Sequence, residues 1–467
     1  MREQLKFLLS AIKRDGCLHA DDYVTEWIRN QKESISVKVE ISHFSEMENW
    51  TCDSKSFRHA TGRFFSIQGI KVKTDWFSGG MTSWCQPIIN QPEIGYLGFI
   101  VKEINGVFHF LVQAKVEPGN VNAVQLSPTL QATKSNYQKV HSGKSPAYLD
   151  YFKNARPEHI LLDQLQSEQG GRFLKKRNRN IIIQVEDDLV VRENFIWLTL
   201  LQLKELMKID NLVNMDSRTV ISGLSFGTYN HQVRSYFQTQ FGLSHFGQCL
   251  LNSYSNADVG DTFEVLSHLT TLKSQYELDI QNIDLNQVEN WIMTDSRMYH
   301  EDRRYFEVLP VKVSIDNREV TSWHQPMISP LQEGLCAVVC QIIDGVVYLI
   351  LQAKLECGNH DILEFAPTVQ TLLGNYKEVN EHNIPFLYQV LNAPSESIYF
   401  NSLQSEEGGR FYKEQNRNMV IVDERNEFIE LPQNFYYFSL GQAVELLRFN
   451  NILNIQVRNL IATLSFV

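Results

Sequence analysis

The chain has 467 residues, 43% of them hydrophobic, and a formal net charge of −11 at pH 7. This length is enough for two or three domains with buried cores, whereas the acidic balance disfavours nucleic-acid binding, which usually needs a basic surface. No apolar run reaches the roughly 18 residues that a membrane span requires, and residues 1–20 lack the apolar core of a signal peptide. We therefore expect a cytoplasmic protein that binds neither nucleic acid nor membrane.

The predicted elements of the first half follow its turn signals. Apolar runs at 94–104 and 107–116 flank Asn105-Gly106, and an Asn-Gly pair in this setting is the strongest short signal for a hairpin. Residues 181–185 form a further predicted strand, and residues 197–208 have helical periodicity. These patterns predict an α+β fold with an antiparallel hairpin near its centre.

Between the two similar parts of the chain lies a segment that is expected to be mainly helical. Residues 228–275 have mainly helical patterns, with a polar loop expected at 252–261. Beyond them the earlier signals return: a hairpin turn at Asp344-Gly345, a strand at 419–422 and a helix at 438–448.

Motifs of the first half recur in the second half at a nearly constant offset, which predicts a tandem duplication. Glu48-Asn49-Trp50 recurs 241 residues later, and the segment 165–173 recurs 238 residues later. The two copies span about 36–226 and 276–467. We expect an N-terminal domain at 1–227, a helical connection at 228–275 and a C-terminal domain at 276–467, packed as two globular units.

A polar face is predicted on the second strand of the hairpin. Strand alternation places Gln113, Lys115 and Glu117 on one side of it. Either they line a cavity or they form the solvated face of an edge strand, and their recurrence as Gln352, Lys354 and Glu356 favours the cavity. An ion pair between Lys115 and Glu117 is a further alternative.

Other polar side chains are candidates for binding a sugar or a nucleotide. The segment 124–137 is rich in hydroxyls and amides, which suits a sugar but is also typical of a surface loop. Arg172 follows Gly170-Gly171 and is expected either to bind a diphosphate or to pair with Glu168. Trp84 is expected to stack on a base or to lie in the core. The binding candidates are Trp84, Gln86, Gln113, Asn120, Ser127, Thr129, Gln131, Asn136, Glu168 and Arg172.

Taken together, these segments resemble the signature of the NDP-hexose 2,3-dehydratases, over nearly the whole chain. The resemblance implies two Nudix-like domains, each a mixed sheet with flanking helices, and a homodimer. It also implies a dTDP-4-keto-6-deoxyglucose substrate, a 3,4-diketo-2,6-dideoxy product and a 3-ketoreductase that acts next. The matching segments are Trp84-x-Gln-Pro, Gln113-Ala-Lys-x-Glu-x-Gly-Asn, Ser127-Pro-Thr-x-Gln-x-Thr, Asn136-Tyr-x-x-Val-His141 and Ser167-Glu-x-Gly-Gly-Arg-Phe.

The implied reaction agrees with the residue types present. The 4-keto group acidifies the proton at C3, a base removes it, and the C2 hydroxyl leaves as water. This needs a base, a donor to the enolate and an acid, but neither a metal nor a redox cofactor. We find no GxGxxG, no GxxxxGK[ST], no cluster of metal ligands and no CxxC pair among the seven cysteines. Neither copy has the Glu-rich helix that pyrophosphate hydrolysis by a Nudix enzyme requires.

Differences between the copies predict which of them is active. Where the first copy has Ser127, Thr133, Ser135 and His141, the second has Ala366, Leu372, Gly374 and Asn380. We therefore expect the active site in the first copy and a degenerate pocket in the second, which retains Trp323, Lys354, Tyr376 and Arg410.

Catalytic roles are assigned within the first copy. Lys115 is expected to stabilise the enolate and Tyr137 to donate to the leaving hydroxyl. Histidine is the side chain whose unperturbed pKa lies near neutrality, so His141 is a candidate base or acid, with Glu117 as the alternative base. Two other functions stay open: a nucleotide-sugar binding protein without activity, and an isomerase or epimerase that uses the same enolate.

Overall fold

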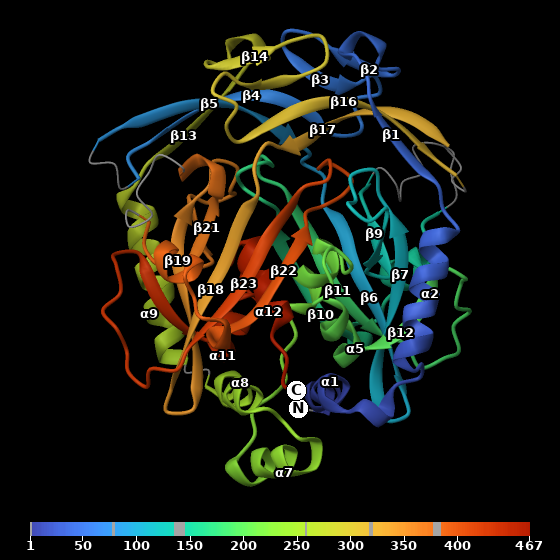
Figure 1. The fold of residues 1–467 in the computed structure, drawn as a ribbon, viewed down its shortest axis with the longest axis vertical. Helices are drawn as coiled ribbons and strands as arrows, with labels where there is room; N and C mark the ends of the chain where they lie inside the picture. The colour runs from blue at the N-terminus through green and yellow to red at the C-terminus, as the bar shows by residue number, and fades with distance from the viewer. Residues whose placement is uncertain (1, 77–79, 135–144, 257–258, 317–320, 377–383) are drawn as a thin grey trace.

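The structure is a computed structural model that describes residues 2–76, 80–134, 145–256, 259–316, 321–376 and 384–467. The fold is α+β with mixed sheets, as predicted. Two seven-stranded sheets stand side by side beneath two five-stranded sheets, and the chain termini lie next to each other at the opposite end of the molecule (Figure 1).

The two seven-stranded sheets, one in each half of the chain, share one topology. The first has the order β10-β11-β6-β7-β12, with β8 beside β7 and β9 beside β6, and only the β11–β6 pair is parallel. The second repeats this arrangement, and its one parallel pair is β18–β23. The strands are β6 (Gly95–Ile104), β7 (Val107–Val116), β8 (Val124–Ser127), β9 (Leu130–Ala132), β10 (Ile160–Ser167), β11 (Arg177–Gln184), β12 (Phe195–Thr199), β18 (Gly334–Ile343), β19 (Val346–Leu355), β20 (Leu363–Ala366), β21 (Val369–Leu372), β22 (Ile398–Ser405), β23 (Gln415–Asp423) and β24 (Phe435–Ser439).

The predicted hairpins and strands are confirmed, while two predicted helices begin later than expected. Both residues of the Asn105-Gly106 turn have positive φ, 51° and 77°, as the primed turns require. Residues 195–199 pair with β7 as a strand, so α5 (Leu200–Leu206) begins after the Thr199 N-cap, whose side chain accepts from the backbone of Gln202. In the same way, α11 (Leu440–Leu446) begins after Ser439.

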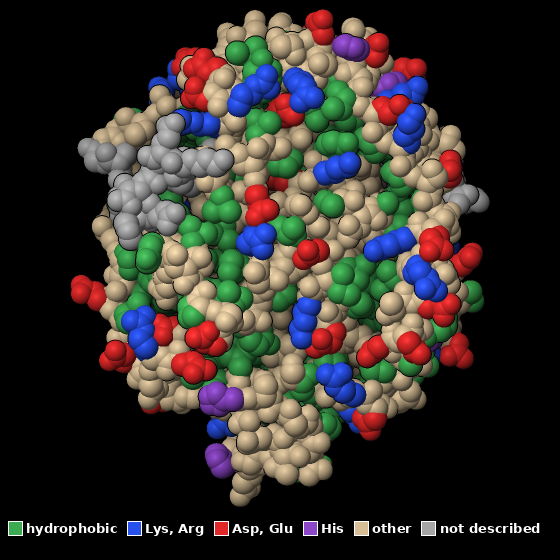
Figure 2. Space-filling view, viewed as in Figure 1, with side chains coloured by type: hydrophobic (Ala, Val, Ile, Leu, Met, Phe, Trp, Pro, Cys, Tyr) green, Lys and Arg blue, Asp and Glu red, His purple; other side chains and the backbone are tan. Residues whose placement is uncertain are grey.

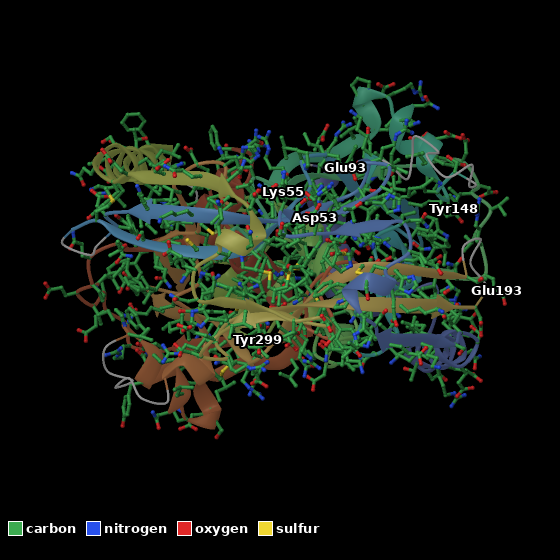
Figure 3. The ribbon with its side chains drawn as sticks, turned by 90° about the horizontal axis from the view of Figure 1, so that it is seen from above. Asp53, Lys55, Glu93, Tyr148, Glu193 and Tyr299 are labelled. Atoms are coloured by element: carbon green, nitrogen blue, oxygen red, sulfur yellow. The ribbon has the colours of Figure 1, made fainter. Side chains whose placement is uncertain are left out.

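The five-stranded sheets exchange strands between the halves. In each, the first strand of one half completes the sheet of the other: β1 pairs with β16, and β13 pairs with β4. Seen from above, first-half and second-half strands run beside each other (Figure 3). The strands are β1 (Val37–Ile41), β2 (Trp50–Cys52), β3 (Ser56–His59), β4 (Ser66–Thr74), β5 (Thr82–Asn90), β13 (Leu278–Ile283), β14 (Trp291–Met293), β15 (Met298–His300), β16 (Phe306–Ile315) and β17 (Ser322–Pro330).

The helical segment after residue 227 is largely the counterpart of the N-terminal helices. In α1 (Arg2–Ile12), the Ser10 hydroxyl donates to Phe108 O at 2.6 Å and accepts from Leu200 N at 2.9 Å. In α8 (His245–Ser255), Ser253 does the same with Val347 O at 2.5 Å and Leu440 N at 2.8 Å. α7 (His231–Phe241) thus joins two similar units. The predicted polar loop is shorter than expected, because α8 extends to Ser255 and α9 (Val259–Gln275) begins soon after.

The remaining helices lie between or beside the sheets, and α2 is the longest of them, with 13 residues. They are α2 (Asp21–Glu33), α4 (Leu149–Lys153), α6 (Met215–Ile221), α10 (Leu387–Leu391) and α12 (Ile455–Thr463), with 3-10 turns at Arg14–Gly16, Phe44–Glu46, Pro157–His159, Leu285–Gln287, Leu373–Tyr376 and Ser395–Ser397.

One hydrophobic core runs through both halves. It joins apolar residues of α1, β6 and β7 with those of β18, β19 and α12, from Phe7 to Phe466. The predicted boundaries at 227 and 276 stay a prediction, because strand exchange and a shared core interleave the two halves. Figure 2 shows acidic and basic side chains interspersed over one face of the molecule. Among the described residues, no helix has the length and apolar character needed to cross a membrane.

Candidate active site

A cavity of about 110 Å³ lies at one end of the central strands of the first seven-stranded sheet. Most of its lining comes from the first half, on β6, β7, β9, β11 and α6. The second half contributes the loop 406–411, which reaches across from the end of β22. Its charged and amide lining residues are Gln91, Lys115, Glu117, Gln131, Glu168, Lys176, Asn178, Asp216, Glu407 and Arg410.

The predicted polar face of β7 contributes directly to this cavity. Lys115 Nζ lies 3.3 Å from Glu117 Oε1, so the pairing considered as an alternative is present within the cavity. Gln131 Nε2 donates to the same carboxylate at 3.0 Å, and Asn214 Nδ2 donates to Gln131 Oε1 at 3.1 Å. In the second half, Lys354 donates instead to the Gln370 carbonyl at 3.2 Å.

Three more carboxyl groups gather beside this pair. Glu168 and Asp216 are buried and Glu407 is half-buried, and one buried oxygen of each has no hydrogen-bond partner among the described residues. Burial and nearby Glu407 together raise the pKa of Glu168 to about 7, against the lowering effect of Lys176. Burial, then Glu168 and Glu407, raise the pKa of Asp216 well above its ordinary value. Burial raises the pKa of Glu407 as well, so burial favours the protonated form of all three carboxyl groups.

Two cations border the carboxyl groups. Lys176 Nζ donates to the backbone carbonyl of Glu93, a residue labelled in Figure 3, and burial lowers the pKa of Lys176. Arg410 Nε donates to Gln91 Oε1 at 3.3 Å, and its guanidinium carbon lies 4.4 Å from the centroid of the Phe65 ring. These contacts hold a planar cation at the wall of the cavity.

Arg410 lies in the first-half cavity because the two Glu-x-Gly-Gly-Arg loops cross over. Gly119 N donates to Gly408 O at 2.7 Å, and Gly358 N donates to Gly170 O at 2.6 Å. Arg172, predicted to serve the first-half site, therefore lies outside its cavity, with its guanidinium 4.2 Å from the Phe306 ring of the second half. Arg410, predicted for a vestigial second site, takes its place.

Trp84 and Gln86, both predicted to bind the nucleotide, instead form hydrogen bonds that support the crossing loop. Trp84 Nε1 donates to Gln86 Oε1 at 2.9 Å, and Gln86 Nε2 donates to Gly171 O at 3.1 Å. Trp323 and Gln325 make the same contacts to each other and to Gly409, at 2.8 and 2.7 Å. Neither Trp84 nor Gln86 lines the cavity.

The other binding candidates are divided between the cavity and the scaffold. Gln131 and Glu168 line the cavity, whereas Gln113 does not. Ser127 and Thr129 are buried and donate to the carbonyls of Pro128 and Leu111, respectively. Asn120 packs against Gly408, where an added Cβ would meet its Oδ1. Asn136, Tyr137, His141 and the side chain of Tyr376 lie outside the described residues.

Five charged or amide residues of the cavity were missed from the sequence: Gln91, Lys176, Asn178, Asp216 and Glu407. A signal for two of them was present in the alignment of the halves. Asp216 aligns with Gln456, and Glu407 aligns with Gln169, so each is a carboxylate in one half and an amide in the other. A comparison limited to residues that are identical in both copies overlooks these carboxylate-for-amide differences. Among the described residues, no group of three or more His, Cys, Asp or Glu side chains is placed to hold a metal ion.

A family model for NDP-hexose 2,3-dehydratases matches the chain twice, at residues 21–224 and 262–464. The chain belongs to the NDP-hexose 2,3-dehydratase family. Both matched segments carry one seven-stranded sheet and the loop that crosses to the other half. The resemblance predicted from the motifs is thereby confirmed.

Curated relatives of this dehydratase chain match along almost their whole length. A dTDP-4-dehydro-6-deoxy-alpha-D-glucopyranose 2,3-dehydratase of Saccharopolyspora spinosa is 41% identical, over 94% of this chain and 90% of the relative. Proteins of the same name from Amycolatopsis orientalis and Streptomyces violaceoruber are each 37% identical, over 98% and 93% of this chain and 93% and 95% of the relatives.

Among solved structures, the chain is similar to an ADP compounds hydrolase at 17% identity, over 31% of this chain and 76% of that one, with a TM-score of 0.20. That likeness is too low to assign the fold, so the Nudix-like domain stays a prediction.

Proposed function

We propose that this dehydratase removes water across C2 and C3 of dTDP-4-keto-6-deoxy-D-glucose, as a carbon-oxygen lyase of deoxysugar biosynthesis. The observation that carries the proposal is the first-half cavity, where Lys115 and Glu117 lie together beside carboxyl groups whose pKa values are raised. The chemistry needs a base, a cation at the enolate and an acid within one small volume. The names of the curated relatives support the choice of substrate.

The Lys115–Glu117 pair is assigned to the first half of the reaction. Glu117 takes the proton from C3, and the electron pair moves onto the C4 oxygen as an enolate. Lys115 stabilises that oxygen with its positive charge, which acts strongly in a buried site. Tyr137 and His141 stay candidates for a donor and for a base or acid, from a segment outside the described residues.

The nucleotide is assigned to the Arg410 side of the cavity. A guanidinium matches the geometry of phosphate oxygens, and contacts with Gln91 and Phe65 already hold this one in place. We propose it, rather than Arg172, as the residue that binds the diphosphate. Lys354 and Trp323 belong to a degenerate second pocket in this proposal.

The common topology of the halves supports descent from a tandem duplication of a Nudix-like domain, with the working site in the first copy. A homodimer, a cytoplasmic location and a 3-ketoreductase that receives the product complete the proposal.

Turnover by the purified chain tests this function. The chain is incubated with dTDP-4-keto-6-deoxyglucose, a 3-ketoreductase and NADPH, and the last two trap the diketone by reducing it. The mass of the product is then measured by mass spectrometry. We expect a product without the C2 oxygen, and about a 100-fold or greater loss of rate in Lys115→Met, a size typical of losing one electrostatic group. Lys354→Met is the matched control in the second half and is expected to leave the rate unchanged.

The alternatives give other products. Epimerisation or isomerisation would leave the C2 oxygen in the product and exchange the C3 proton with solvent. Tight binding of the sugar nucleotide with neither exchange nor loss of water would support the binding-protein alternative instead.

A further inference from the structure

We propose that Asp216 is the acid that gives its proton to the departing C2 hydroxyl, and that Glu407 from the second half, with Glu168, keeps that proton in place. This assignment rests on the dehydration proposed above and adds a catalytic residue that the motifs did not indicate.

The first argument comes from the equivalent place in the second half, where the carboxylate is fully satisfied by amides. Glu406, the counterpart of Glu168, accepts from the side chains of Asn416, Gln456 and Gln169. Gln456 comes from α12 of the same half, while Gln169 arrives on the crossing loop of the first half. Amide donors at 456 and 169 are therefore sufficient, with Asn416, to satisfy one buried carboxylate.

The first-half cavity replaces both amides with carboxyl groups. Asp216 stands where α12 has Gln456, and Glu407 stands where the other loop has Gln169. Because the loops cross, these two changes lie in different halves of the sequence but line the same cavity. Within the described part of the chain, Glu168 keeps only the counterpart of Asn416 as a side-chain donor, which is Asn178 at 2.6 Å. Asp216 and Glu407 are two independent amide-to-carboxyl differences, and both line one cavity. This convergence indicates a function there other than packing.

The buried oxygens of the cluster that lack a hydrogen-bond partner point to a ligand. Asp216 has 2% of its surface exposed, lines the cavity and has an Oδ1 atom without a hydrogen-bond partner among the described residues. One oxygen of Glu168 and one of Glu407 are in the same state. A buried polar atom without a partner costs about 1–3 kcal/mol, so three in one cavity indicate groups that find partners when the substrate is bound.

Electrostatics assign the proton to Asp216. After burial itself, the groups that act on it are Glu168, Glu407 and Glu117, which favour the protonated form, and Lys115, which opposes it. The lining also includes the cations Lys176 and Arg410. Carboxyl groups this close cannot all be ionised. Glu117 has the Lys115 cation at 3.3 Å. Glu168 accepts from Asn178 Nδ2 at 2.6 Å, and Glu407 accepts from Gly409 N at 3.0 Å. Among the described residues Asp216 has no ion pair within 4.0 Å and its Oδ1 has no hydrogen-bond donor, so Asp216 is the group that keeps a proton.

The proton balance then closes over the whole reaction. Glu117 takes the C3 proton, the C4 enolate forms, and its electron pair returns to make the C2–C3 double bond while the C2–O bond breaks. The proton of Asp216 joins the departing hydroxyl, which leaves as water. In the final tautomerisation, ionised Asp216 takes the proton of the C3 enol hydroxyl, and Glu117 gives its proton to C2. Both residues return to their starting states.

The test compares proton exchange with loss of water in the full chain. Wild type, Asp216→Asn and Glu407→Gln are incubated with the 4-keto sugar nucleotide in D₂O, and C3 deuteration and water loss are followed by mass spectrometry. We expect Asp216→Asn to keep C3 exchange and dTDP binding while water loss falls about 100-fold or more, the usual contribution of a general acid. Glu414→Gln is the matched control, because it removes a buried carboxyl with a raised pKa from the second half.

A second readout covers the case in which Asp216→Asn does not fold. Glu407→Gln places at 407 the residue type that stands at 169, and removes a negative charge beside Asp216. We expect the alkaline limb of its rate profile to move to lower pH, because Asp216 then loses its proton more easily. An unmoved limb, or wild-type water loss by a folded Asp216→Asn, would overturn this assignment and leave the dehydratase proposal intact. A wild type that neither exchanges C3 nor loses water would overturn both.

Discussion

The buried carboxyl group of Glu414 links the stability of the fold to pH. Burial raises its pKa from an ordinary value of 4.5 to about 7, and nearby Arg172 opposes the rise. Between these two pH values the native state binds a proton that the unfolded chain has released. The stabilisation from this group is therefore fully present below pH 4.5 and is lost as pH rises through 7.

Glu414→Gln tests this linkage, because an amide has no proton to lose. We expect the melting temperature of the wild type, relative to that of the variant, to fall between pH 5 and pH 8. Thermal unfolding followed by circular dichroism at the two pH values measures the difference. Parallel pH dependence of the two proteins would contradict the raised pKa of Glu414.

Which site residues can be predicted depends on how locally their positions are determined. Lys115 and Glu117 were placed together because alternation along a strand is a property of neighbouring residues. Asp216 and Glu407 were not, since they meet only after the loop of one half crosses into the other. Arg172 lies outside the first-half cavity for the same reason, because no local pattern shows that the loop crosses to the other half.

At the scale of elements, the sequence predicted the hairpins well and the loops poorly. Asn105-Gly106 and Asp344-Gly345 determine turns through their own backbone preferences, and both turns are present. The helix starts near residues 200 and 440 were predicted a few residues early, because pairing with β7 and β19 takes the preceding residues into strands. Tertiary pairing overrode local periodicity there.

The loop crossing depends on glycine at position 119. A Cβ built there would lie 1.6 Å from the Phe411 carbonyl oxygen, so backbone would have to move. We expect Gly119→Ala to destabilise the chain by about 3–5 kcal/mol, at the upper end for single substitutions. Urea unfolding measures the change. Gly80→Ala is the control: no atom of the described residues beyond its chain neighbours lies within 4 Å of an added Cβ, and the expected change is within about 0.5 kcal/mol. Similar effects of both substitutions would refute the close approach.

For the whole molecule, the duplication was visible in the sequence but the interleaving was not. A constant offset between motifs shows that two segments share a fold, and says nothing of how they pack. The structure joins them through β1–β16, β13–β4 and a core that spans both halves. The cavity is shared between the halves as well, because Glu407 and Arg410 of the second half complete a site built mainly from the first.

Neither half is therefore expected to fold or work alone. A chain of residues 1–243 would expose the apolar surface that α6 packs against α12, and would lack the β16–β17 cover over Ala114 and Val116. We expect it to show no cooperative thermal transition and no turnover. Expressed together with residues 244–467, it should co-purify as a complex with dehydratase activity, because the contacts between halves need no peptide bond between them. A first half that melts cooperatively and dehydrates the sugar alone would show that Glu407 and Arg410 are dispensable, and that the crossing loops serve assembly and not catalysis.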